Sequence, residues 1–304
     1  MTAQAAPQTS PARAWLLAAR PATLPAAAVP VLVGAGAALG EGSIFKPLIF
    51  FTTLICALLI QIGTNFANDY SDFHRGADHE GRLGPIRVTQ SGLITQEGVR
   101  RGIIVAFGLA LALGLYLAYI GGWPIILIGS LSILAGLAYT GGPFPFGYHG
   151  LGDFFVFVFF GLIAVTGTAY LQTGAWSSFA LLLAVPIGLL VTNILVINNL
   201  RDLPTDSAAG KRTLAVRMGD RASRMQYALF TALAYLTPLS RAVGYHHDRW
   251  LLLPWITLPF GIFLTRRVLS PISGRDLNPI LKLTGQLLLA FGVLLAIGAA
   301  LGRP

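Results

Sequence analysis

The chain has 304 residues, of which 55% are hydrophobic and only 11% are charged, and its formal net charge is +9. A soluble globular domain carries roughly 25% charged residues, so this composition excludes a chain whose whole surface faces water. The mean hydropathy of +0.70 indicates a protein that is surrounded by lipid over most of its surface.

Nine apolar segments are long enough to cross a bilayer as helices, which takes about 20 residues each. The segments are 22–40, 47–67, 101–120, 123–140, 151–172, 176–200, 223–243, 250–269 and 280–301. The sequence therefore predicts an all-α, polytopic membrane protein with nine transmembrane helices. Residues 1–12 are expected to form a disordered cytoplasmic tail, and residues 13–304 a single transmembrane domain.

The basic residues are distributed unequally between the two sides that nine helices define. The N-terminus and the loops after the second, fourth, sixth and eighth helices contain 17 of the 21 lysines and arginines. Cytoplasmic loops of membrane proteins carry such an excess, so these segments are expected in the cytoplasm. Because topology explains the positive charge, we expect no nucleic-acid partner.

The first polar island is NDYSDFHRGAD (68–78), at the end of the predicted helix 47–67. Gln61, Asn65, Asn68 and Asp72 follow one another at steps of 4, 3 and 4 residues, which places them on one helix face. Amide and carboxyl groups at membrane depth are costly and are usually turned inward for a function. This face is therefore predicted to line an interior site.

The second polar island is NNLRDLPTDSAAGKRTLAVR (198–217), at the end of the predicted helix 176–200. Asn198, Asp202 and Asp206 recur at steps of 4 residues and again share one face. Pro204 disfavours helix at the residue before it, so the helix is expected to kink or end between the two aspartates. Both islands follow an even-numbered helix, so they lie on the same side and are predicted to converge.

Carboxylates in two facing groups, with basic residues around them, suit a diphosphate that is held through metal. Mg²⁺ prefers hard oxygen ligands and typically bridges carboxylates to substrate phosphates. The two groups are predicted to hold a pair of Mg²⁺ ions, while basic side chains take the remaining phosphate charge: Arg82, Arg87, Lys211, Arg212 and Arg217. The alternative, two ordinary solvated loops, is disfavoured by the matching asparagine faces on one side.

Four segments together resemble the UbiA-type intramembrane prenyltransferases. They are AWLLAARPATLPAAAVPVLVGAG, NDYSDFHRGAD followed by RLGPIR, YTGGPFPFGYHGLGDFFVFVFFG, and NNLRDLPTDSAAGKRTLAVRMG. Within that family they are most similar to the branch that prenylates 1,4-dihydroxy-2-naphthoate in menaquinone biosynthesis. The resemblance extends from Trp15 to Gly219, and the last three predicted helices add little to it.

The resemblance implies a bundle of nine helices around a central cavity, capped by cytoplasmic loops, in the bacterial inner membrane. It implies catalytic roles for Asp72, Asp202 and Asp206, and metal ligation by Asn68, Asp69, Asp72, Asp78, Asp202 and Asp206. The implied substrate contacts are Asn65, Asn68, Arg82, Arg87, Tyr139, Tyr148, Asp153, Lys211 and Arg217. Gly76 stands where the ubiquinone-type pattern has an acid, so Asp78 is expected to lie off the helix.

Two further features each allow two interpretations. The loop with Tyr139, Tyr148 and Asp153 contains no lysine or arginine. It either orients an aromatic acceptor with help from Asp153, or is a compact connector in which Asp153 caps the next helix. Arg20 is either an anchor at the membrane interface or a contact for the acceptor carboxylate, and the anchor is slightly favoured.

The implied reaction is the Mg²⁺-dependent transfer of a polyprenyl chain from polyprenyl diphosphate to 1,4-dihydroxy-2-naphthoate. Loss of CO₂ would give demethylmenaquinone. One alternative is another aromatic acceptor, such as 4-hydroxybenzoate or homogentisate. An alternative of a different class is a cation-coupled transporter, but transporter sites tend to lie near the bilayer midplane. The acids here lie at helix ends among basic residues, which favours the enzyme.

Overall fold

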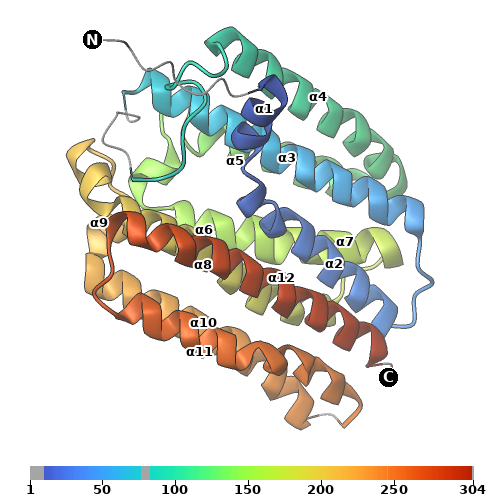
Figure 1. Cartoon of the computed structure of the whole chain (residues 1–304). Helices are drawn as coiled ribbons and strands as arrows, with labels where there is room; N and C mark the ends of the chain where they lie inside the picture. The colour runs from blue at the N-terminus through green and yellow to red at the C-terminus, as the bar shows by residue number, and fades with distance from the viewer. Residues whose placement is uncertain (1–9, 77–82, 245, 303–304) are drawn as a thin grey trace, which may run out of the picture.

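The computed structural model describes residues 10–76, 83–244 and 246–302, and these residues form helices and connecting turns (Figure 1). The helices are α1 (Pro11–Ala19), α2 (Pro25–Gly40), α3 (Pro47–His74), α4 (Gln96–Gly121), α5 (Trp123–Ala138), α6 (Gly152–Val156), α7 (Ala164–Thr173), α8 (Ser178–Ala208), α9 (Leu214–Met218), α10 (Asp220–Gly244), α11 (Leu258–Leu269) and α12 (Leu277–Leu301). A π-helical stretch, Phe157–Ile163, joins α6 to α7, and a 3₁₀ stretch, His246–Thr257, precedes α11.

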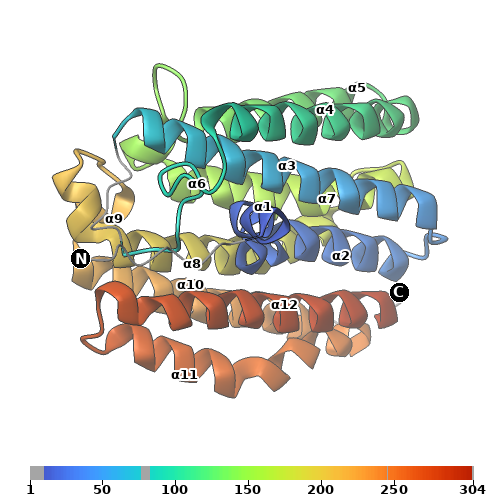
Figure 2. The same cartoon turned by 45° about the horizontal axis from the view of Figure 1, so that its top comes forward.

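Helix α8 is the centre of the bundle. In its most apolar window 78% of the residues are buried, compared with 22% in α4, so α8 packs on all sides whereas α4 faces lipid. Figure 2 shows the same order, with α4 and α5 at one edge, α11 at the other, and α2 and α8 between them. The main core cluster accordingly follows α8 from Ala180 to Leu200.

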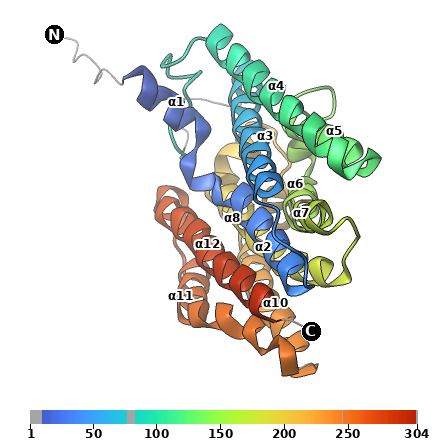
Figure 3. The same ribbon diagram turned by 90° about the vertical axis from the view of Figure 1, so that its right-hand side faces the viewer.

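Small residues bring α2 and α12 into close contact, and the two helices lie side by side in Figures 1 and 3. A side chain on Gly36 would overlap the carbonyl of Ala296, and one on Gly292 would overlap Val29. Backbones that approach this closely are typical of helix pairs in membranes. The α2–α12 face is therefore tightly packed.

The predicted number of transmembrane helices, nine, is not confirmed. Within residues 10–76, 83–244 and 246–302, six helical stretches are long and apolar enough to cross a membrane, and a seventh is added if the pair Pro11–Thr23 and Pro25–Gly40, bent by 52°, counts as one span. Helix α5 has 16 residues and is about 24 Å long, which is short for a bilayer core of about 30 Å. Helix α10 begins in a charged turn with Asp220 and includes Pro238, and it is not among the six.

Two expectations about helix ends are also corrected. Helix α1 begins at Pro11, capped by Ser10, so the boundary expected after residue 12 falls inside a helix; residues 1–9 lie outside the described ranges. Helix α8 continues through Pro204 to Ala208. The Thr205 hydroxyl donates to the Asp202 carbonyl at 2.9 Å, and packing against α10 and α12 overrides the local preference of the proline.

One buried arginine closes the carboxyl end of α11. The guanidinium of Arg224, on α10, donates to three backbone carbonyls, those of Val268, Ser270 (2.7 Å) and Ile272 (2.7 Å). It also forms an ion pair with Asp220 (Nε–Oδ2 2.7 Å). The last carbonyls of a helix have no partner within the helix, so Arg224 supplies donors that α11 itself cannot.

We expect Arg224→Ala to lower the free energy of unfolding by about 2–4 kcal/mol, because buried carbonyls would lose their donors. Thermal melting in detergent, followed by tryptophan fluorescence, measures the effect. Arg221→Ala is the matched control, since Arg221 lies one turn earlier on the same helix but is exposed. Equal melting of the two variants would contradict this role of Arg224.

Candidate active site

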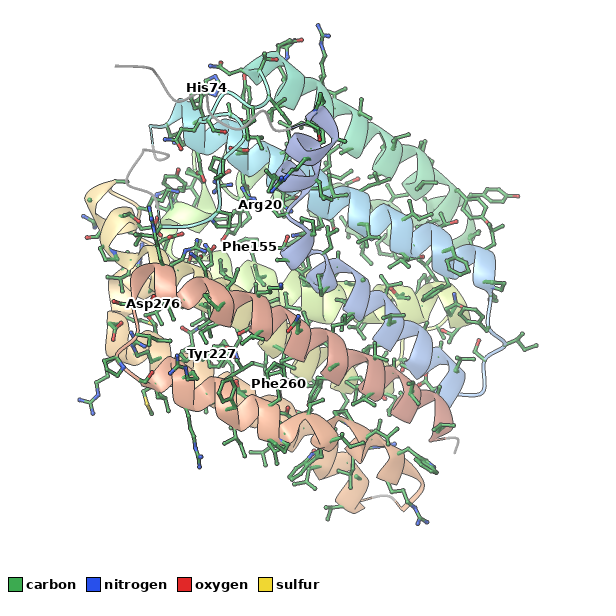
Figure 4. The ribbon with its side chains drawn as sticks, in the orientation of Figure 1. Arg20, His74, Phe155, Tyr227, Phe260 and Asp276 are labelled. Atoms are coloured by element: carbon green, nitrogen blue, oxygen red, sulfur yellow. The ribbon has the colours of Figure 1, made fainter. Side chains whose placement is uncertain are left out.

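The two predicted aspartate groups come together at one end of the bundle. Helices α3 and α8 both end on the side of the bundle where α9 lies (Figure 2). Figure 4 shows His74, in the last turn of α3, at the same end of the bundle as Asp276, which precedes α12. Their polar faces line a single cavity, whose polar lining includes Arg20, Thr23, Gln61, Asn65, Asn68, Asp72, Arg87, Tyr139, Tyr148, Asn198, Asn199, Asp202, Asp206 and Lys211. The predicted convergence of the two islands is therefore confirmed.

Asp72 is the centre of this cavity, and three separate segments bind to it. Its Oδ2 lies 3.0 Å from Nη2 of Arg87, and its Oδ1 lies 3.3 Å from Nζ of Lys211. The hydroxyl of Tyr148 donates to Oδ1 at 2.7 Å. Lys211 Nζ also lies 4.6 Å from the centroid of the Tyr148 ring, within the range of a cation–π contact. One buried carboxylate thus joins two cations and a phenol from three loops.

The turn after α8 explains how Lys211 reaches the cavity. The helix ends at Ala208, and Gly210 has a positive φ of 74°, a conformation that glycine adopts readily at helix ends. The amide of Lys211 then donates to the carbonyl of Asp206 at 2.9 Å, which turns the chain back over the helix end. The next amide, of Arg212, donates to the carbonyl of Tyr148 at 2.9 Å, so the two loops are joined directly.

The asparagines of α3 organise the other wall of the cavity. Asn65 Nδ2 donates to the carbonyl of Ala19 at 3.0 Å and to the hydroxyl of Thr23 at 3.2 Å. Asn68 Oδ1 accepts a hydrogen bond from the hydroxyl of Thr140 at 2.9 Å. Asn65 therefore holds the break between α1 and α2 against α3, while Asn68 holds the start of the 139–151 loop.

Asp69 does not line the cavity, in contrast to its expected role as a metal ligand. Its Oδ2 accepts the backbone N–H of Val88 at 3.1 Å, and the residue is buried. Successive helix residues are rotated by about 100°, so Asp69 faces the 83–95 loop when Asn68 and Asp72 face the cavity. Asp69 fixes the loop that carries Arg87.

Asp153 and Arg217 also lie outside the cavity lining. Helix α6 begins at Gly152, so Asp153 lies inside its first turn rather than at its cap, and its Oδ2 accepts from Gln226 on α10 at 2.7 Å. Arg217 donates through Nε to the carbonyl of Arg212 at 3.3 Å. Both side chains support the loops around the site. Asp78 and Arg82 fall outside the described residues.

Arg20 lies at the cavity, whereas the sequence slightly favoured an interface anchor. It is the C-cap of α1 with a φ of 52°, and Figure 4 shows it where α1 meets α2. Among the described residues it is the only residue other than glycine with a positive φ, and such strain often marks a functional position. The two prolines within RPATLP, Pro21 and Pro25, are the sequence signal for the break between α1 and α2.

Tyr139 stands at the boundary between the polar cavity and an apolar chamber. Burial raises the pKa of its hydroxyl well above the usual range, and the nearby carboxylates of Asp153 and Asp72 add to this. The hydroxyl therefore stays protonated. Tyr139 also lines the apolar chamber, which extends between α3, α5 and the π-helical stretch. Phe155, which lines this chamber, lies inside the bundle in Figure 4.

The apolar chamber has two parts, which follow one another away from the polar cavity. The first part shares Gln61, Thr64, Tyr139, Val156 and Phe160 with the polar cavity. The second part shares Ala57, Ile60, Ser132, Phe159 and Ala164 with the first, and it extends to Ile125 and Leu171. The polar cavity therefore adjoins a row of two apolar spaces.

The donor set fits Mg²⁺ that is bound together with a phosphate. Asn68, Asp72, Asp202 and Asp206 present hard oxygen atoms to one cavity. Within the part of the chain that the structure describes, no group of three or more His, Cys, Asp or Glu side chains is gathered for a metal. Mg²⁺ usually binds through one or two carboxylates plus substrate phosphates and water, so a substrate would complete the coordination.

Comparison with known proteins identifies the family of the chain. Residues 27–284 match the UbiA prenyltransferase family. The 1,4-dihydroxy-2-naphthoate octaprenyltransferase of Mycobacterium tuberculosis is 38% identical over 291 residues, which are 95% of this chain and 97% of that protein. The Escherichia coli protein of the same name is 36% identical over 302 residues, which are 97% and 98% of the two chains.

Solved structures share the fold. A UbiA homologue from Archaeoglobus fulgidus superposes with a TM-score of 0.66 at 14% identity, over 95% of this chain and 98% of that one. The same homologue bound to DMAPP and Mg²⁺ gives a TM-score of 0.63 at 15% identity, over 93% and 99%. Because the family match and the relatives cover nearly all of the sequence, the chain belongs to the UbiA prenyltransferase family.

Proposed function

We propose that the protein transfers a polyprenyl chain from polyprenyl diphosphate to 1,4-dihydroxy-2-naphthoate, with loss of CO₂, giving demethylmenaquinone in its reduced, quinol form. The observation that carries the proposal is that two kinds of space lie next to each other. One cavity gathers both aspartate groups with Arg87 and Lys211, and it shares one wall with the two-part apolar chamber. A diphosphate with an isoprenoid tail has this division into a charged head and an apolar chain.

The diphosphate end would lie against α3 and α8. Asn68, Asp72, Asp202 and Asp206 would hold Mg²⁺, in a pair of ions as the two groups suggest, and the metal would supply positive charge to stabilise the leaving diphosphate. Lys211 and Arg87 are both bonded to Asp72 in the structure. They would turn their charge to the phosphate oxygens, where cations fixed before the reaction are most effective.

The reaction would proceed by breaking the allylic C–O bond, with the electron pair leaving on the diphosphate. The ring carbon that carries the carboxylate would then form the new C–C bond with the allylic carbon. Its bond to the carboxylate would break, so that CO₂ leaves and the electron pair of that bond restores the aromatic ring. Tyr139 lies at the boundary of the two spaces, and burial raises its pKa so that it keeps its proton. It would contact the acceptor ring. Arg20 lines the same cavity and carries the charge that a carboxylate needs.

The membrane orientation follows from the charges near the site. Arg75, Arg87, Lys211, Arg212 and Arg217 belong to the loops at the end where the aspartates lie. Basic loops of membrane proteins stay in the cytoplasm. We therefore place the site at the cytoplasmic face of a bacterial inner membrane.

The first test is the reaction itself. Membranes that contain the protein should convert octaprenyl diphosphate and 1,4-dihydroxy-2-naphthoate to the prenylated, decarboxylated product only when Mg²⁺ is present. A chelator should abolish the product, and added Mg²⁺ should restore it, as measured by chromatography and mass spectrometry. If 4-hydroxybenzoate or homogentisate were prenylated instead, that compound would replace dihydroxynaphthoate as the proposed acceptor. Full turnover in excess chelator would rule out the metal.

Variants of the aspartates and of Lys211 should differ in which steady-state constant, kcat or KM, they change most. Asp72→Asn or Asp202→Asn should lower turnover by about 10²–10³-fold, the typical effect of losing one electrostatic stabiliser of a transition state. Lys211→Ala should raise KM for the diphosphate more than it lowers kcat, because a charge on phosphate also helps the bound substrate. Glu97→Gln is the control, because Glu97 also binds two arginines, Arg100 and Arg101, but on the surface. Wild-type turnover in both aspartate variants would refute the assignment.

The apolar chamber predicts a dependence on chain length. Ser132 lines the junction of its two parts, so Ser132→Leu should obstruct a long chain and leave a short one unaffected. We expect the ratio of kcat/KM for octaprenyl to geranyl diphosphate to fall about tenfold or more, as for other misfits in apolar pockets. Leu131→Phe, on the exposed side of the same helix, should leave the ratio unchanged. An unchanged ratio in Ser132→Leu would mean that the prenyl chain does not occupy this chamber.

A further inference from the structure

Arg201 is the largest of the fully buried side chains, with a relative exposure of 0%. It precedes Asp202 on the central helix α8, where the sequence alone predicted no role for it. A buried charge is costly unless it is paired and hydrogen-bonded. The partners of Arg201 therefore indicate why the chain keeps a cation at this position.

The guanidinium of Arg201 forms a fork around the carboxylate of Asp202. Nε lies 2.8 Å from Oδ1 and Nη2 lies 2.5 Å from Oδ2. Nη2 also donates to Oδ1 of Asn198, one turn earlier, at 2.8 Å. Paired bonds of this kind fix the plane of a carboxylate as well as its position. A carboxylate has about four lone pairs, so the fork orients Asp202 while leaving it capacity for further bonds.

Asn278, from helix α12, completes this arrangement. Its Oδ1 accepts from Nη1 of Arg201 at 3.0 Å, and its Nδ2 donates to the carbonyl of Leu83 at 3.0 Å. These partners determine the orientation of the amide, because a guanidinium only donates and a carbonyl only accepts. Asn278 thus joins α8, α12 and the 83–95 loop at a single side chain.

The bonds form a path between the two aspartate groups. Asp202 is held by Arg201, which is held by Asn278, which holds Leu83. Four residues after Leu83, Arg87 of the same loop is bonded to Asp72. Helix α12 carries none of these aspartates. Through Asn278 it is nevertheless connected to Asp202 and to the loop that binds Asp72.

We propose that Arg201 and Asn278 are positioning residues for the reaction. Arg201 holds the Asp202 carboxylate in the orientation that faces the cavity, and Asn278 holds Arg201 and ties the Arg87 loop to it. The inference rests on the proposed function, in which Asp202 acts at the diphosphate. It adds a requirement that α12 be docked at Asn278 before the site is complete.

The charges near Asp202 give a physical reason for this arrangement. Asp202 and Asp206 are one helical turn apart and both line the cavity, so their like charges repel. The cation of Arg201 offsets one of the two charges from the protein side. Without Asn278, part of the support for that cation on the α12 side would be lost, and the fork around Asp202 would be free to shift.

Asn278→Ala tests the proposal directly. We expect kcat to fall by about 10–100-fold, the usual effect of removing a group that orients a ligand-binding side chain, with KM for the acceptor nearly unchanged. Thr284→Val is the matched control, because Thr284 is also a hydrogen-bonded polar residue of α12 but binds the hydroxyl of Tyr227 on α10, at 3.0 Å. Its kcat should equal that of the wild type. Wild-type kcat in Asn278→Ala would overturn the proposal.

A double-mutant cycle distinguishes positioning from a general loss of structure. If Asn278 acts through Asp202, then Asn278→Ala should have little further effect on kcat in an Asp202→Asn background, since coupled sites are not additive. A purely structural role would lower kcat by the same factor in both backgrounds, and that additive result would overturn the proposal.

Asn278→Asp provides a second variant of nearly the same shape. It retains an acceptor for Arg201 but loses the donor to Leu83, and its carboxylate competes with Asp202 for the guanidinium. We expect its kcat to be at least as low as that of Asn278→Ala. Wild-type kcat in Asn278→Asp would contradict the path through Arg201.

A binding measurement keeps the test independent of turnover. Inorganic pyrophosphate with Mg²⁺ should raise the melting temperature of the purified wild type and of Thr284→Val by the same amount, and that of Asn278→Ala by clearly less. An equal shift in all three would overturn the positioning role. If the wild type shows the shift in melting temperature but prenylates none of the acceptors, the proposed function fails. The comparison of the three melting shifts still decides the positioning role.

Discussion

The cap of this bundle depends on the buried carboxylate of Asp72. Arg87, Tyr148 and Lys211 come from three different loops, and each of them bonds to it. Without this anion, two cations would face one another in a site that is largely shielded from water, which is strongly unfavourable. The same contacts hold the cations where a diphosphate would need them. Binding would therefore exchange partners among groups that are already desolvated and in place, so that little reorganisation is left for the reaction itself.

A second constraint comes from α8, which has to be apolar for most of its length and polar at one end. Its core positions from Ala180 to Leu200 pack against helices on every side. Its last turns present Asp202 and Asp206 to the cavity. A helix buried this deeply moves little, and a site on such a helix is held more precisely than one on a loop. Asp202 and Asp206 thus stand on the most deeply buried of the candidate spans, whereas Arg87 and Lys211 come from the cap loops.

The parts of the site that follow helical periodicity could be predicted from the sequence. Asn68, Asp72, Asp202 and Asp206 do share one cavity, because spacing along a helix determines which residues share a face. Asp69, expected as a metal ligand, is not among the residues that line the cavity, because the 83–95 loop binds it through the N–H of Val88. Arg201 and Asn278 could not be found, because their bond joins helices 77 residues apart. The sequence did not show that α8 continues past Pro204 to Ala208, and the count of nine spans is not confirmed, since packing decides whether a local signal prevails.

Two of the buried arginines, Arg201 and Arg224, show how a chain with few charges uses them. Both guanidiniums have multiple donors engaged, as a buried cation requires. Arg224 donates mainly to backbone carbonyls at the end of α11, and its acidic partner Asp220 is half exposed, so its contribution is to the fold. Arg201 donates to a carboxylate that lines the cavity and to side-chain amides of α8 and α12. The chemistry of the partners, rather than the degree of burial, therefore distinguishes an arginine that closes a helix from one that orients an acid in the site.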